Sequence, residues 1–286
     1  MKIIKYFFEF IFIITFFFIF KVIGYKRASN LGEIIGKQFG PFFRSNSKIQ
    51  KNLEKSNIGT SQNNRKKIID NMWGNYGRIL SEYIFLEQFR KNSLKKFLEI
   101  DGLNFLNEIK KNNEQVVFIS GHFNNFELMA MEIEKAGINL CTIYRPLNNP
   151  FLNIVMEKLR KKYICKYQIK KGKSGTRNLL KLFKENFSVA LMIDQRVSEG
   201  ESINLFNRLA KTTTIPAQLA KKYNCKVVPV YIKRFDKLHF KLSFKKPIKF
   251  DNTLSIKQIS LELNTILEKM ILQNPDQWIW SHDRWK

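Results

Sequence analysis

Cysteine is scarce in this sequence, and the cysteines present are far apart. Cys141, Cys165 and Cys225 are the only three among 286 residues, and none belongs to a C-x-x-C pair. Widely spaced thiols in odd number are typical of a reducing compartment. We therefore expect neither a disulfide framework nor a zinc site.

The chain also lacks internal repeats and any linker rich in glycine, serine or proline. Its hydrophobic content of 44% is that of a folded protein and excludes the disordered class. The length of 286 residues permits one large domain or two small ones, and it is ample for a buried core.

Acidic residues are few relative to basic ones. The sequence has 24 acidic residues and 50 lysines and arginines, which gives a net charge of +26. Such a charge indicates an anionic partner: nucleic acid, an anionic membrane surface or a phosphorylated substrate. Compositional drift is the alternative explanation, because lysine, asparagine, isoleucine and phenylalanine are frequent throughout the chain.

The segment 158–184 contains no acidic residue at all. It is either a solvated helix and loop or a binding surface for phosphates or for an acidic carrier protein. Nucleic-acid binding requires aromatic side chains among the basic ones, and the candidates here are only Tyr163 and Tyr167. We expect no nucleic-acid partner.

One long hydrophobic run is present, at the N-terminus. It extends from Tyr6 to Phe20 and is interrupted by a charge only at Glu9. A full membrane span needs about 20 residues, and flanking lysines allow a shorter one. No small-x-small cleavage site follows, which disfavours a signal peptide. We predict a retained membrane anchor or in-plane helix over residues 1–24, with the remainder, 25–286, as one domain on the cytoplasmic side.

Beyond the anchor, helical and strand patterns alternate. Apolar runs predict strands at 115–120, 140–144, 188–193, 226–232 and 240–244, the last at the sheet edge. Helical periodicity predicts helices around 68–83, 125–136, 151–163, 174–186, 215–223 and 255–273, the last capped by Ser255. This alternation favours an α/β fold with a mostly parallel central sheet flanked by helices.

Polar residues follow three of the predicted strands. His122 comes after the first, Arg145 after the second, and Asp194, Gln195 and Arg196 after the third. In open α/β sheets, ligands bind in the crevice beyond the carboxyl ends of the strands. The pattern therefore predicts a site at this edge of the sheet.

His122 and Glu127 are the candidate catalytic pair. If His122 is in a turn and Glu127 in the first helical turn, the glutamate can orient the imidazole while the other ring nitrogen takes a proton. The alternative makes them a structural turn residue and a helix-start carboxylate. The sequence has no G-x-S-x-G and no H-E-x-x-H motif, so we expect no covalent serine nucleophile and no metal. The base would then act on a substrate hydroxyl or on water.

These residues lie within five motifs that occur in a recognisable order: "SGHFNNFE", "YRPLNNP", "MIDQ", "LFNRLAKTTTIPAQLA" and "NPDQWIWSHDRWK". In this order the sequence resembles the bacterial lipid A biosynthesis acyltransferases, the late lauroyl and myristoyl acyltransferases of the lysophospholipid-acyltransferase superfamily. The similarity covers the chain from about residue 25 to its C-terminus and extends to the anchor.

The resemblance implies roles for individual residues. His122 and Glu127 match the family's H-x4-D/E catalytic pair. The substrate-binding candidates it implies are Asn125, Arg145, Asp194, Gln195 and Arg196. Its terminal W-x-H-x-R motif falls on Trp280, His282 and Arg284. The family usually has glycine where this chain has Asn124; asparagine tolerates left-handed backbone, so we expect the turn to be kept.

The resemblance also implies an activity. Such an enzyme moves a fatty acyl chain from acyl carrier protein to a hydroxyl of a phosphorylated lipid A precursor, at the cell inner membrane with its catalytic domain on the cytoplasmic side. No metal or organic cofactor is expected. Two alternatives stay open: the same chemistry on a phospholipid or another glycolipid, and a non-catalytic, basic, membrane-tethered binding protein.

Overall fold

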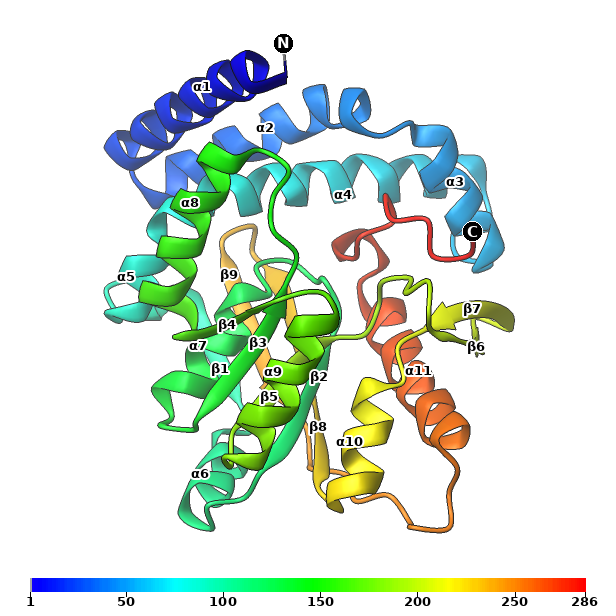
Figure 1. Ribbon diagram of the computed structural model, residues 1–286. Helices are drawn as coiled ribbons and strands as arrows, with labels where there is room; N and C mark the ends of the chain where they lie inside the picture. The colour runs from blue at the N-terminus through cyan, green and yellow to red at the C-terminus, as the bar shows by residue number, and fades with distance from the viewer. Residues whose placement is uncertain (1) are drawn as a thin grey trace.

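A seven-stranded sheet with helices around it forms the body of the molecule (Figure 1). The computed structural model describes residues 2–286. The strand order is β1-β9-β8-β2-β5-β3-β4; β8 and β9 pair in antiparallel fashion, and the other neighbours are parallel. The strands are β1 (Leu98–Asp101), β2 (Val116–Ser120), β3 (Leu140–Tyr144), β4 (Tyr167–Lys170), β5 (Ser188–Met192), β8 (Lys226–Phe235) and β9 (His239–Phe244). The predicted α/β class with a mostly parallel sheet is confirmed.

All five predicted strands lie where the apolar runs place them, and one needs a correction of its position in the sheet. β9 was expected at the edge of the sheet, and this is wrong, because β1 pairs along its outer side from Leu98↔Phe240 to Asp101↔Ser243. The sequence of β1 is short and half-exposed, so no continuous apolar run marks it.

Three further strands were not predicted. β4 falls in the basic segment 158–184, and the hairpin of β6 (Glu201–Leu205) and β7 (Arg208–Thr212) falls in a region expected to be loop. Each has only four or five residues, and most of their side chains are exposed or half-buried. Strands of this kind lack the hydrophobic pattern by which the central ones are found.

The predicted helices are present, and four others lie in the segments 25–55 and 86–111, where no individual helix was predicted. The helices are α1 (Lys2–Ile23), α2 (Tyr25–Phe43), α3 (Asn46–Lys55), α4 (Gln62–Glu82), α5 (Leu86–Arg90), α6 (Leu103–Lys111), α7 (Glu127–Lys135), α8 (Pro150–Leu159), α9 (Lys173–Lys184), α10 (Ile215–Tyr223) and α11 (Ile256–Gln273). Ser255 caps α11 in a capping box with Gln258, as expected from the sequence. α9 packs against β3, β4 and β5, and α10 against β2 and β8.

Within the described residues, α1 is the one helix long and apolar enough to cross a membrane. Only 11% of its apolar window is buried inside the protein. Length and composition thus agree with the predicted N-terminal membrane helix.

α2 and α4 pack with their backbones almost in contact. A Cβ atom on Gly36 would overlap the carbonyl oxygen of Trp73, and one on Gly32 would overlap that of Gly77. No side chain larger than hydrogen fits at these crossing points, so the glycines set the distance between the two helices.

The C-terminal end of α4 is tied to the sheet by a buried ion pair. The Arg234 guanidinium of β8 donates two hydrogen bonds to the Glu82 carboxylate, at 2.7 and 2.9 Å. Ser29 of α2 donates to the same carboxylate at 2.7 Å. Breaking one partner of such a pair leaves a buried charge uncompensated, so this network fixes the end of α4 above the sheet.

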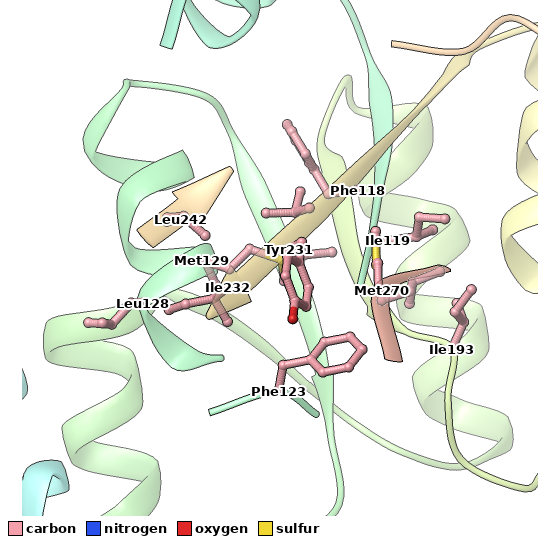
Figure 2. Packing of buried hydrophobic residues seen from close by; sticks show 14 of the residues in the cluster. Phe118, Ile119, Phe123, Leu128, Met129, Ile193, Tyr231, Ile232, Leu242 and Met270 are labelled. Atoms are coloured by element: carbon pink, nitrogen blue, oxygen red, sulfur yellow. The ribbon is translucent and has the colours of Figure 1, made fainter. Parts of the chain in front are cut away.

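The hydrophobic core lies between the sheet and its helices (Figure 2). Figure 2 shows the Phe123 ring beside Tyr231, and their centroids are 5.1 Å apart in an edge-on arrangement. Phe123 has no exposed surface. Its neighbour in sequence is His122, so core packing on this phenylalanine holds the histidine's turn in place.

Candidate active site

His122 lies in the turn between β2 and α7, at the carboxyl edge of the sheet. The turn begins with a hydrogen bond from the Phe123 amide to the Gly121 carbonyl oxygen, at 2.8 Å. Asn124 has a φ of 42°, in the left-handed region, and its side chain donates to the Gln277 side chain at 2.6 Å. The expectation that asparagine keeps this turn in place of glycine is therefore confirmed.

The His122 imidazole is paired with Asp194, which follows β5. The ring Nδ1 lies 2.8 Å from Asp194 Oδ1, and the His122 amide donates to Asp194 Oδ2 at 2.8 Å. A carboxylate can only accept, so Nδ1 carries the proton and Nε2 is the free base nitrogen. The Trp278 indole N–H donates to Oδ2 at 2.9 Å. Asp194 is fully buried, whereas 21% of the His122 side chain is exposed.

The partner of His122 was expected to be Glu127, and the structure differs on this point. Its carboxylate accepts hydrogen bonds from Arg160 Nε at 2.8 Å and from the Tyr83 hydroxyl at 3.1 Å. Glu127 opens α7 and points to the segment after α8, whereas β2 and β5 are neighbouring strands, so their ends bring His122 and Asp194 together. Spacing within one chain segment cannot reveal a contact that depends on strand pairing.

The pKa values of the pair shift in opposite directions. Burial is the largest influence on the pKa of His122 and lowers it. The charge and hydrogen bond of Asp194, followed by the charge of Glu127, together raise it by more, so the pKa of His122 lies above the usual 6.5. For Asp194, burial raises the pKa, and the His122 charge, the hydrogen bonds from His122 and that from Trp278 outweigh it, so the pKa falls below 3.8. The pair therefore favours a carboxylate beside a readily protonated imidazole.

Glu127 belongs to a second, separate cluster. The Arg160 guanidinium binds it through both Nε and a terminal nitrogen, each at 2.8 Å, and lies about equally far from the rings of Tyr83 (6.0 Å) and Tyr144 (5.9 Å). Arg160 opens a π-helical turn, Arg160–Ile164. π-Helical turns occur frequently at functional sites. Arg160 is thus held by the Glu127 carboxylate and lies close to two aromatic rings.

The remaining predicted residues differ in their contacts and in their exposure. The Gln195 amide nitrogen lies 3.4 Å from His122 Nε2. Arg196 donates its backbone N–H to His282 Nε2 at 2.9 Å. Asn125 is fully buried, and neither polar atom of its side chain has a hydrogen-bond partner among residues 2–286. Arg145 is exposed past the end of β3.

Comparison with known proteins identifies the family of the chain. The family model for bacterial lipid A biosynthesis acyltransferases matches residues 1–286. The chain belongs to this family. It is similar to the lipid A biosynthesis palmitoleoyltransferase of Escherichia coli K12, with 25% identity over 265 residues, which is 90% of this chain and 84% of the relative. It is also similar to the lauroyltransferase of that strain, with 23% identity over 269 residues (92% and 86%), and to a Haemophilus influenzae lipid A biosynthesis acyltransferase, with 23% over 266 residues (88% and 83%).

The chain is therefore an acyltransferase of lipid A biosynthesis, which acts with an acyl donor on a lipid A precursor. The predicted family resemblance is confirmed. In this acyltransferase the C-terminal segment closes the site from one side. Fully buried Arg284 donates to Thr212 Oγ1 of β7 at 2.8 Å, and Asn52 of α3 donates to the carbonyl oxygens of Trp280 and His282 at 2.9 and 3.0 Å.

Three residues of this acyltransferase site were not found by sequence reasoning: Tyr83, Arg160 and Trp278. Arg160 lies in the basic segment 158–184, where nothing in the sequence distinguishes it from the other lysines and arginines. Trp278 lies within the quoted C-terminal motif but outside its W-x-H-x-R part, and Tyr83 was predicted only as the end of a helix around 68–83. The one signal common to them is that each is an aromatic or arginine side chain buried beside a carboxylate.

Proposed function

We propose that this acyltransferase moves a fatty acyl chain from an acyl carrier protein thioester to a hydroxyl of a phosphorylated lipid A precursor, with His122 as general base. The observation that carries the proposal is the His122–Asp194 pair. Its hydrogen bond leaves Nε2 unprotonated, on a side chain that is partly exposed. A base of this kind acts directly on a hydroxyl.

The reaction follows from that protonation state. His122 Nε2 accepts the hydroxyl proton as the oxygen attacks the thioester carbonyl carbon. The C–O bond forms, the tetrahedral intermediate collapses, and the C–S bond breaks. The leaving thiolate takes the proton back from Nε2, so the enzyme ends in its starting state. Asp194 holds the ring and stabilises the imidazolium through the buried hydrogen bond.

Glu127 does not take part in the proton transfer itself and acts on it indirectly. Its charge raises the pKa of His122, and it holds Arg160 at the site through two contacts of 2.8 Å. In this proposal Arg160, Arg145 and Arg196 supply positive charge for substrate phosphates or for the developing oxyanion. Asn125 and Gln195 complete the set of substrate-binding residues.

The partners and location follow from charge and from α1. A net charge of +26 suits both a phosphorylated acceptor and an acidic carrier protein. Residues 1–24 are proposed as the membrane anchor and 25–286 as the acyltransferase domain. The basic excess after the anchor supports a cytoplasmic position for that domain at the inner membrane.

The test is transfer by the purified full chain, supplied with acyl carrier protein thioesters or coenzyme A thioesters and with candidate acceptors, and followed by mass spectrometry. We expect His122→Ala to lose about 10²–10⁴-fold in turnover, the usual contribution of general-base catalysis. His239→Ala is the matched control, because that histidine stacks on Phe97 and Phe235 away from the pair. Folded His122→Ala protein with near-normal transfer would contradict the mechanism.

A further inference from the structure

Two adjacent phenylalanines at the end of α2 lie almost entirely in solvent. Phe42 is 85% and Phe43 is 81% exposed, and Phe39, one turn earlier, is 53% exposed. The rings of Phe39 and Phe42 lie 6.4 Å apart. Exposed apolar residues are ordinary when scattered, but contiguous large ones mark an interaction surface. We call residues 39–51 the α2–α3 corner.

Packing against α4 keeps the Phe42 ring turned outward. Gly40 of α2 faces the Trp73 ring so closely that a Cβ atom on it would overlap the indole. Phe42 comes two residues later, about 200° round the helix axis from Gly40. The side of α2 that carries Phe42 is therefore opposite to the side held by α4, and the ring cannot turn into the core.

Basic residues surround this aromatic group. Residues 34–53 contain no acidic residue. Arg44, Lys48 and Lys51 are all exposed, and they follow the phenylalanines directly in the chain. Aromatic and aliphatic side chains flanked by lysine and arginine are the composition of surfaces that enter the interfacial region of anionic bilayers.

The helix that precedes α2, α1, is itself apolar on its outer side. α1 packs on α2 and is held to α8 by contacts of the Phe7 and Phe10 rings with Phe151, at 5.8 and 5.9 Å, and by a hydrogen bond of 2.8 Å from Asn149 to the Tyr6 carbonyl oxygen. Its other side is exposed at Ile4, Phe8, Ile11, Phe12, Phe18, Ile19 and Val22. In Figure 1, α1 and α2 lie along the same end of the molecule. One flat surface can therefore touch both.

We propose that the α2–α3 corner is a second membrane contact. Phe39, Phe42 and Phe43 insert among the lipid headgroups, and the basic residues after them bind anionic headgroups. This contact is additional to the α1 helix. It does not depend on the catalytic assignment, so its failure would leave the proposed reaction intact.

The direct test places a polarity-sensitive fluorophore on the corner of the full chain. The three native cysteines are buried, so Phe43→Cys is labelled selectively. On vesicles containing phosphatidylglycerol, we expect blue-shifted emission and quenching by brominated lipid. Leu261→Cys on α11 is the control, because that leucine is also exposed and Figure 1 places the first half of α11 at the far end from α1 and α2. A label at position 43 that stays water-like on vesicle-bound protein would overturn the proposal.

Substitutions separate the apolar and charged contributions. We expect Phe42→Ser with Phe43→Ser to weaken partition to these vesicles by about tenfold or more, since two large apolar side chains are lost. The triple change Arg44→Glu, Lys48→Glu and Lys51→Glu should weaken binding to phosphatidylglycerol vesicles and leave binding to phosphatidylcholine vesicles unchanged. All five side chains are exposed, so melting temperatures should not move. Partition unaffected by both sets of changes would reject the contact.

The same label tests whether the corner binds a protein instead of a membrane. If its emission shifts when protein concentration rises without vesicles, the corner binds a second copy of the chain. If it shifts on addition of acyl carrier protein alone, the corner binds that protein. Either result would overturn the membrane assignment.

Discussion

Two buried carboxylates raise the pKa of one histidine, His122, and they have different partners. Asp194 pairs with the His122 imidazole, whose charge changes near neutral pH, and with two N–H donors. Glu127 pairs with the Arg160 guanidinium, which keeps its charge at every physiological pH. The first arrangement is suited to moving a proton, and the second to holding a fixed positive charge.

The difference separates two tasks that the H-x4-E spacing assigns to one pair of residues. Glu127, the carboxylate closer in sequence to His122, holds Arg160. Asp194, which follows the neighbouring strand β5 of the sheet, orients the imidazole. Arg160 contacts Glu127 Oε1 through two nitrogens, and the Tyr83 hydroxyl donates to the same oxygen. Changes at the two carboxylates should therefore have distinct consequences.

The largest effect is expected for Asp194→Asn. The amide can donate to Nδ1 and so favours the tautomer with its proton on Nε2, which removes the base. Turnover should fall by about 10²–10⁴-fold, the full contribution of general-base catalysis. Because His122 and Asp194 act as a unit, the double change with His122→Ala should be scarcely worse than either single change. Losses that multiply would show that the two residues act independently.

A smaller loss of activity with a larger change in stability is expected at the second cluster. Arg160→Gln leaves the Glu127 charge buried without a cation, which costs about 3–5 kcal/mol of the free energy of unfolding. Glu127→Gln together with Arg160→Gln should recover much of that stability. Activity should stay reduced by about tenfold or more, since the fixed charge is gone. Melting temperature and turnover of the three variants decide this; activity that recovers with stability would make the cluster purely structural.

How much of this could be predicted from the sequence depends on the range of the interactions. β2, β3, β5 and β8 were found because a strand covered on both faces is a continuous apolar run. His122 and Asp194 were found because each follows such a run. β4, β6 and β7 were missed because short, half-exposed strands carry no such pattern.

Partners in the site could not be predicted, for a physical reason. The Arg160–Glu127 contact joins residues 33 apart, and the Trp278–Asp194 contact joins residues 84 apart. Such contacts are set by strand order and by the path of the C-terminal segment over the sheet edge. Neither is encoded in local periodicity. The sequence therefore placed His122 and Asp194 at one edge of the sheet, but it paired His122 with Glu127 and the structure pairs it with Asp194.

A change at Trp278 is expected to have a moderate effect on turnover, and it tests the hydrogen bonding of Asp194. Trp278→Phe removes the N–H that donates to Asp194 and keeps an aromatic ring in place. Turnover should fall by about tenfold, on the order of one charge-assisted hydrogen bond. Trp280→Phe is the matched control, since its N–H donates to the Pro275 carbonyl oxygen and its ring stacks edge-on against Trp278 at 4.6 Å. Equal losses in both variants, tracking their melting temperatures, would reduce Trp278 to a packing residue.

The smallest expected effect is a shift of the pH profile. The base must be neutral, and the pKa of His122 is raised above 6.5, so kcat/KM should rise with pH through an inflection above that value. The charge of Asp194 raises this pKa more than that of Glu127, so Asp194→Asn should move the inflection further down than Glu127→Gln. Equal shifts would mean that the two carboxylates act on His122 alike.

The sign for stability follows from the same pKa values. The raised pKa of His122 stabilises the fold below pH 6.5, and this contribution is lost as pH rises through the folded-state value. The lowered pKa of Asp194 stabilises the fold above pH 3.8, and this contribution is lost as pH falls through the folded-state value. Melting curves of wild type and Asp194→Asn against pH measure both.

The glycine contact between α2 and α4 has a mechanical consequence. α4 touches α2 through Gly77, and its C-terminal end leads directly into Tyr83, which binds Glu127. Halfway along it, Tyr76 lies near enough to Asp194 that, after burial, the aspartate charge raises the pKa of the tyrosine. One helix therefore reaches the surroundings of both carboxylates, at Tyr76 and just beyond its end at Tyr83. A larger side chain at Gly36 or Gly77 would force α2 and α4 apart and so displace the surroundings of Asp194 and Glu127 together.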